Sequence, residues 1–156
     1  MQPLPHVYTV SAAGGASGEV SLTAVGVPRL MSAAPAQFDG PGNQWSPESL
    51  LAAAIASCFL LTFRAVARAS RLTWQQLECE IEATLERAEG VTRFTRVVTR
   101  AALTVPQSVE THLCEQALTK TEHTCLVANS LNCARELQIR ITRVPVTQKT
   151  PELEVS

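Results

Sequence analysis

Residues 46–63 read SPESLLAAAIASCFLLTF, and this stretch decides the fold. Ser46 is a preferred helix N-cap residue, Pro47 suits the first helical position, and Glu48 favours the positive end of the helix dipole. The next residues are apolar on nearly every side, which is typical of a helix buried on most sides. Their apolar run of about 14 residues is shorter than the roughly 18 to 20 that a membrane-spanning helix needs. We therefore predict a central core helix over about 47–69, with no membrane as a partner.

Cys58 lies in the middle of this predicted helix. A free cysteine is often buried as a small hydrophobic residue, so inert packing is one interpretation. The alternative is that its thiol is the reactive group of the protein. Glu48 lies ten residues earlier, about 15 Å along one rigid helix. If Glu48 helps to build a site at Cys58, it must therefore come from a second chain.

The segments around this helix predict an α+β fold with antiparallel sheets. Short alternating runs separated by small residues predict N-terminal strands, and a switch to a two-residue period after Gln75 predicts a half-buried hairpin that turns at Glu89-Gly90. The expected elements are N-terminal strands over about 6–33, the hairpin over about 75–105, helices over about 108–134 and a last strand over about 136–146.

The sequence also predicts cross-strand ion pairs in the hairpin and the position of one cysteine. The polar face of the hairpin carries glutamates on one strand and arginines on the other, and we expect Arg96 opposite Glu82 and Arg100 opposite Glu78. We also expect Cys125 at the start of a short helix, where free backbone N–H groups and the dipole stabilise a thiolate.

Composition excludes several classes of function. At 156 residues the chain fits a single domain over 1–156, and its net charge of −1 without a basic block argues against a nucleic-acid partner. The first residues show no secretory signal, so we expect a cytoplasmic protein. Five cysteines in a reducing compartment do not form a disulfide framework. No dinucleotide, phosphate-loop or zinc-enzyme motif is present, so we expect neither a cofactor nor a metal, and thiol chemistry remains.

Two segments together resemble the signatures of the OsmC/Ohr family, the osmotically induced and organic-hydroperoxide-resistance proteins. Residues 45–59 resemble the central helix of that family, with the expected spacing from Glu48 to Cys58. Residues 122–131, which read EHTCLVANSL, are similar to the helix of the second cysteine, although Leu126 stands where a proline usually follows that cysteine. The order of elements agrees from about residue 7 to 143. The resemblance implies an OsmC-like fold built as an intertwined homodimer, with active sites at the subunit interface.

The resemblance also implies a thiol-dependent peroxidase. Cys58 would attack an organic hydroperoxide and become a sulfenic acid, Cys125 would resolve it as a disulfide, and a dithiol reductant, lipoyl or similar, would reset the pair. The well-studied hydroperoxide-resistance branch has an activating arginine in the first hairpin turn, which here reads GGASG over 14–18. Arg29 is the nearest upstream substitute, although a solvated surface arginine is the more ordinary interpretation of this residue.

Two other functions stay open at this point. The missing arginine and Leu126 also fit a non-catalytic OsmC-like dimer that binds a small hydrophobic ligand in the interface cleft. A structural protein with inert, buried cysteines is the third possibility. The candidate site residues are therefore Cys58, Cys125, Glu48 and Arg29.

Overall fold

The structure is a computed structural model, and it describes residues 2–145. The chain divides between Leu51 and Ala52 into two compact units. The prediction of one domain over 1–156 stays a prediction.

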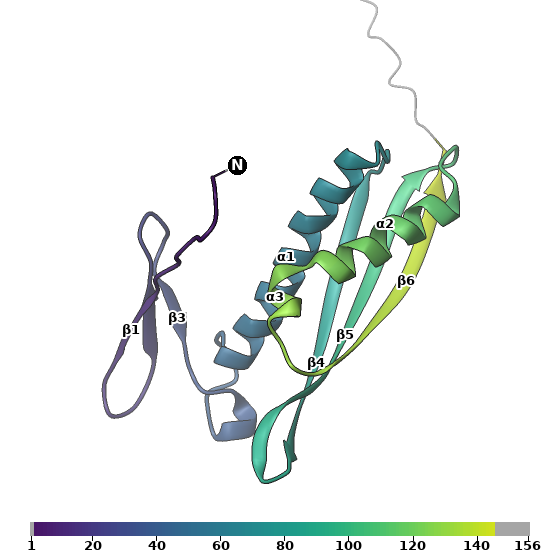
Figure 1. Ribbon diagram of the computed structural model, residues 1–156. Coiled ribbons are helices and arrows are strands. Elements are labelled where there is room, and N and C mark those ends of the chain that lie inside the picture. Colours follow the sequence, from purple (N-terminus) through teal and green to yellow (C-terminus); the bar gives the residue numbers. More distant parts are fainter. Residues whose placement is uncertain (1, 146–156) are drawn as a thin grey trace, which may run out of the picture. The chain divides into compact units, whose positions relative to one another are not determined.

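The first unit contains a small antiparallel sheet in the order β1-β2-β3 (Figure 1). Its strands, β1 (Ser11–Gly14), β2 (Val20–Thr23) and β3 (Leu30–Ser32), are shorter than the predicted range of 6–33. A 3-10 turn, η1 (Ala36–Phe38), follows in the breaker-rich loop. The amide of Ala33 then donates to the carbonyl of Trp45 at 2.9 Å, which ties the end of this loop back to β3.

Helix α1 runs from Pro47 to Ala69, as the sequence predicts. Ser46 caps it: the amide of Ser49 donates to Ser46 Oγ at 3.2 Å, and the amide of Ser46 donates to Ser49 Oγ at 2.8 Å. The two serines form a reciprocal capping pair, in which Ser49 takes the role that glutamate or glutamine usually has at this position.

Within one chain, α1 buries a single stripe and not most of its surface. The buried residues follow helical spacing: Ile55, Phe59, Phe63, Val66 and Ala67. The Phe63 and Trp74 rings meet edge to face, with centroids 5.2 Å apart. Another part of the helix stays uncovered, and Leu61 is 57% exposed. By length and hydropathy α1 could cross a membrane, but a core helix passes the same test, and here its phenylalanines are packed inside the protein.

The second unit is a three-stranded sheet in the order β4-β5-β6, with α1 and α2 over one face (Figure 1). Its strands are β4 (Gln76–Ala88), β5 (Val91–Pro106) and β6 (Ala134–Val144). Strands β4 and β5 are antiparallel, as expected, but β6 runs parallel to β5, so the prediction of antiparallel sheets is wrong for this pair. A chain that leaves β5, passes through helices and returns to the sheet edge makes a crossover connection, which places the next strand parallel. The last predicted residue of this strand, 146, lies outside the described residues.

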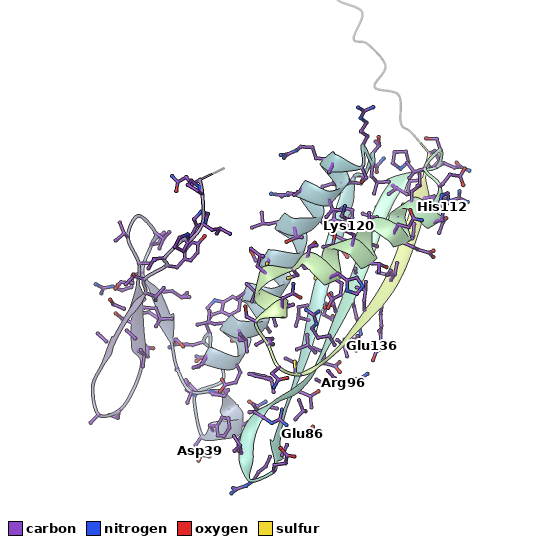
Figure 2. The ribbon with its side chains drawn as sticks, in the orientation of Figure 1. Asp39, Glu86, Arg96, His112, Lys120 and Glu136 are labelled. Carbon is purple, nitrogen blue, oxygen red and sulfur yellow. The ribbon has the colours of Figure 1, made fainter. Side chains whose placement is uncertain are left out.

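The register of the hairpin differs from the predicted one by two residues. Arg96 lies opposite Thr84, and Arg100 opposite Glu80. Glu89 and Gly90 form a tight two-residue turn with φ values of 52° and 82°, and a bulge after Thr84 shifts the pairing by one more residue. Arg100 therefore binds Glu80 and Glu82 at 2.8 Å each, while Arg96 pairs with Glu136 on β6 (Figure 2).

The predicted helical region of 108–134 contains two helices and the start of β6. Helix α2 spans Thr111–Thr124 and helix α3 spans only Leu126–Asn129. Cys125 is the single residue between them, with extended backbone angles (φ −66°, ψ 108°). This one-residue break forms a tight corner that places the start of α3 beside α1 (Figure 1).

Candidate functional site

The centre of the candidate site is the sulfur of Cys58, halfway along α1. The residue is half-buried and adjoins Phe59, which is fully buried. One helical turn later, the hydroxyl of Thr62 lies 3.9 Å from Cys58 Sγ. Helical spacing brings this hydroxyl to the thiol, because residues four apart share a face.

The corner between α2 and α3 supplies further hydrogen-bond donors to this sulfur. Burial raises the pKa of the Cys58 thiol, but hydrogen bonds from the amide of Val127, the thiol of Cys125, Thr62 and the amide of Leu126 outweigh it, and the pKa is lowered. Leu126 and Val127 open α3, so their N–H groups have no partner within that helix and are free to donate. These donors therefore favour the thiolate form of Cys58.

Cys125 has the opposite character. It is fully buried, and burial, followed by the negative charges of Cys58 and Glu122, raises the pKa of its thiol to about 11, against a lowering hydrogen bond from the amide of Ala128. The structure thus brings Cys58 and Cys125 together as an unequal pair. The first is poised as a nucleophile, and the second is a protonated thiol that donates to it.

A third thiol, Cys79 on β4, faces the same region. Burial, followed by the charges of Cys125 and Glu122, raises the pKa of Cys79 to about 12. Such a thiol stays protonated at neutral pH and behaves as a core residue, in line with its position on the apolar face of the hairpin.

The other two predicted site residues belong to the first unit. Glu48 lies in the first turn of α1 and is half-buried, and its Oε2 has no hydrogen-bond partner among the described residues. Arg29 lies in the turn before β3, is exposed, and enters no ion pair within residues 2–145. The roles of both residues at the cysteine pair stay predictions.

The sequence reasoning missed Thr62, the two donor amides and Glu122. Thr62 could have been found, since it follows Cys58 by four residues on a helix. The amides could not, because a backbone N–H has no signature in the sequence. For a metal, no cluster of three or more suitable side chains occurs in the part of the chain that the structure describes.

Comparison with known proteins gives a consistent picture. Residues 40–140 match the family described as OsmC-like protein. The uncharacterized protein YmaD of Bacillus subtilis is 25% identical over 108 residues, which cover 67% of this chain and 72% of YmaD.

Solved structures show the same fold at low identity. An OsmC-like protein of unknown function from Vibrio cholerae superposes with a TM-score of 0.79 at 18% identity, covering 86% of this chain and 99% of that one. The organic hydroperoxide resistance protein OsmC of Legionella pneumophila gives 0.71 at 23% identity, covering 90% and 99%. OhrB, the organic hydroperoxide resistance protein of Bacillus subtilis, gives 0.64 at 18%, covering 88% and 98%. With the matched region spanning most of the chain and both cysteines, the protein belongs to the OsmC-like family.

Proposed function

We propose that this protein is a thiol-dependent peroxidase that reduces organic hydroperoxides, with Cys58 as the peroxidatic and Cys125 as the resolving cysteine. The observation that carries the proposal is the unequal pair: a thiol with a lowered pKa accepts a hydrogen bond from a buried thiol with a raised one. Relatives named organic hydroperoxide resistance proteins support the substrate class. Membership of the OsmC-like family by itself supports a peroxide-related role, without specifying the cysteine mechanism.

The proposed reaction has three steps. The Cys58 thiolate attacks the terminal oxygen of the hydroperoxide, the O–O bond breaks, and the alkoxide leaves as an alcohol after taking a proton. The Cys125 sulfur then attacks the sulfenic sulfur of Cys58. The S–S bond forms, the S–O bond breaks, and hydroxide leaves as water with the proton that Cys125 releases. An external dithiol, lipoyl or similar, reduces the disulfide and is itself oxidised to a disulfide.

Activation of Cys58 does not require an arginine from the first hairpin in this proposal. Two amides, one hydroxyl and one thiol converge on its sulfur, and all of them come from residues 52–145. Hydrogen bonds to the charged form favour that form, as a nearby cation would. The absence of arginine from residues 14–18 therefore does not leave the thiol without an activating group.

The proposal includes a homodimer and a cytoplasmic location. Part of α1 remains uncovered and apolar, with Leu61 exposed, and Glu48 Oε2 lacks a partner among the described residues. A second copy that packs on α1 would cover this apolar surface and could provide a hydrogen-bond partner for Glu48 Oε2. We expect Leu61→Glu to shift the mass measured by light scattering from two chains to one. A wild-type protein that is monomeric at micromolar concentration would contradict this part of the proposal.

Turnover of a hydroperoxide tests the chemistry. Cumene hydroperoxide should be consumed with dihydrolipoamide or dithiothreitol as the electron donor, and Cys58→Ser should abolish the reaction. Cys133→Ser, at a half-buried cysteine that is not among the groups shifting the pKa of Cys58, is the matched control. Wild-type consumption no faster than that of Cys58→Ser would remove the peroxidase and favour the dimer that only binds a small hydrophobic ligand.

A further inference from the structure

Glu122 is a buried carboxylate next to the cysteine pair. It lies in the last turn of α2 and is 9% exposed, and neither of its carboxylate oxygens has a hydrogen-bond partner among the described residues. Its counter-ion is Arg135 on β6, with Nε 3.6 Å from Oε1. Burying a carboxylate with one long ionic contact is costly, so the charge needs an explanation.

Arg135 connects this carboxylate to the corner that carries the donor amides. Its Nη1 donates to Asn129 Oδ1 at 2.9 Å, and Asn129 Nδ2 donates to the carbonyl of His123, also at 2.9 Å. Asn129 is the last residue of α3, and His123 is the penultimate residue of α2. The chain of contacts therefore ties together the ends of both helices on either side of Cys125 and the start of β6.

Four elements place ionisable groups around Cys125. Cys58 faces it from α1, Cys79 from β4 and Glu122 from α2, while Arg135 on β6 pairs with Glu122. The two groups that act on Cys125 by charge, Cys58 and Glu122, are both negative, and they add to burial in raising its pKa. Glu122 is not among the groups that shift the pKa of Cys58.

We propose that Glu122, held by Arg135, is a positioning residue for the cysteine pair: its fixed negative charge beside Cys125 keeps that residue a protonated donor, so that Cys58 alone carries the negative charge. The catalytic benefit of this arrangement rests on the proposed peroxidase function, whereas the effect of Glu122 on the Cys125 thiol does not.

The arrangement also orders the two chemical steps. While Cys58 is a thiolate, two negative charges hold the proton on Cys125. When Cys58 becomes a neutral sulfenic acid, one of these charges disappears, and Cys125 loses its proton more readily. Cys125 therefore becomes a nucleophile only after Cys58 has been oxidised, and it attacks the sulfenic sulfur while hydroxide leaves as water. Burial and the charge of Glu122 then remain as the two causes that oppose ionisation of Cys125.

Site-resolved thiol alkylation across pH tests the assignment on the reduced, full-length protein. Iodoacetamide labelling with peptide mass spectrometry gives a separate midpoint for Cys58 and for Cys125. Glu122→Gln keeps the size of the side chain and removes its charge. We expect the Cys125 midpoint to fall by about half a unit to one unit, roughly a three- to tenfold gain in thiolate near pH 9, with the Cys58 midpoint unchanged. Glu115→Gln, the same change at an exposed position of α2, is the control and should move neither.

Arg135→Gln separates charge from structure. If Arg135 and Glu122 only hold the corner together, both variants loosen Cys125 and both lower its midpoint. In our assignment Arg135→Gln removes the counter-ion of Glu122, and the Cys125 midpoint must not fall. The inference is overturned if Glu122→Gln leaves the Cys125 midpoint unchanged or raises it. It is also overturned if Arg135→Gln lowers the Cys125 midpoint. If Glu122→Gln does not fold, the result for Arg135→Gln decides. Because labelling needs no peroxide, loss of turnover in the wild type would refute the proposed function without touching this result.

Discussion

Replacing Leu126 by proline should weaken the nucleophile by removing one donor and nothing else. Leu126 is the first residue of α3, where its N–H has no partner within the helix and proline is well tolerated. The extended backbone of Cys125 (ψ 108°) suits a residue that precedes proline. The side chain of Leu126 is 76% exposed, so its loss removes little packing.

The size of the effect is set by one hydrogen bond to a charged sulfur. A hydrogen bond to a charged group contributes roughly 1.5 kcal/mol or more, and one pKa unit corresponds to about 1.4 kcal/mol. Among the groups that lower the pKa of Cys58, the Leu126 amide contributes least. We therefore expect Leu126→Pro to raise the pKa of Cys58 by about half a unit to one unit, a roughly three- to tenfold loss of thiolate at neutral pH.

The assay is the pH dependence of Cys58 alkylation, with the melting temperature measured in parallel to establish that each variant is folded. Leu126→Ala is the matched control, because it removes the same side chain and keeps the N–H. If both folded variants give the same Cys58 midpoint, the amide does not activate the thiol and the reasoning is refuted.

The unequal pair leads to two other predictions. Cys125→Ser should still allow the first oxidation of Cys58 but abolish the disulfide. After hydroperoxide treatment, mass spectrometry should therefore find Cys58 as sulfinic and sulfonic acid. An unoxidised Cys58 in this variant would contradict its role as the peroxidatic cysteine. The raised pKa values of Cys79 (about 12) and Cys125 (about 11) mean that the unfolded chain releases these protons first, near the ordinary thiol pKa of about 8.5. Stability to urea should therefore be full below about pH 8 and fall as the pH rises toward about 11 for Cys125 and about 12 for Cys79, by at most about 1.4 kcal/mol per pH unit for each thiol. Cys79→Ser should flatten this slope and Cys133→Ser should not, and a slope unchanged in Cys79→Ser would show that this thiol ionises normally in the fold.

The sequence predicts the central helix well because its signals are local. The cap at Ser46, proline at the first position and the long apolar run all act within a few residues, and α1 begins and ends where they indicate. The predicted hairpin register is wrong for a physical reason: the turn accounts for one residue of the difference, and a bulge after Thr84, which carries no clear local signal, shifts every pair beyond it by one more. The parallel pairing of β6 depends on where the chain returns to the sheet, which is a tertiary property.

The site shows the same division. Both cysteines could be identified from their surrounding motifs, and the structure brings them together. The groups that set their charges could not, because two are backbone amides and the third, Glu122, reaches Cys125 only after α2 ends in a one-residue corner. The exposed apolar part of α1 was predicted to be buried, since a hydrophobic pattern does not say whether its own chain or another one covers it.

Directed donors solve a problem that a single cation would create in this pair. A single positive charge beside two neighbouring thiols lowers the pKa of both to some degree, so it does not by itself decide which of them ionises first. Hydrogen bonds from the amides of Val127 and Leu126 lower the pKa of Cys58, whereas the one from the amide of Ala128 to Cys125 is outweighed by burial, so the pKa of Cys125 stays raised. Glu122, paired with Arg135, acts on Cys125 with the opposite sign and adds to the rise of its pKa. In the proposed mechanism, selective activation of Cys58 therefore results from hydrogen bonds to its sulfur together with the burial of Cys125 and the negative charge of Glu122, without an arginine in the first hairpin.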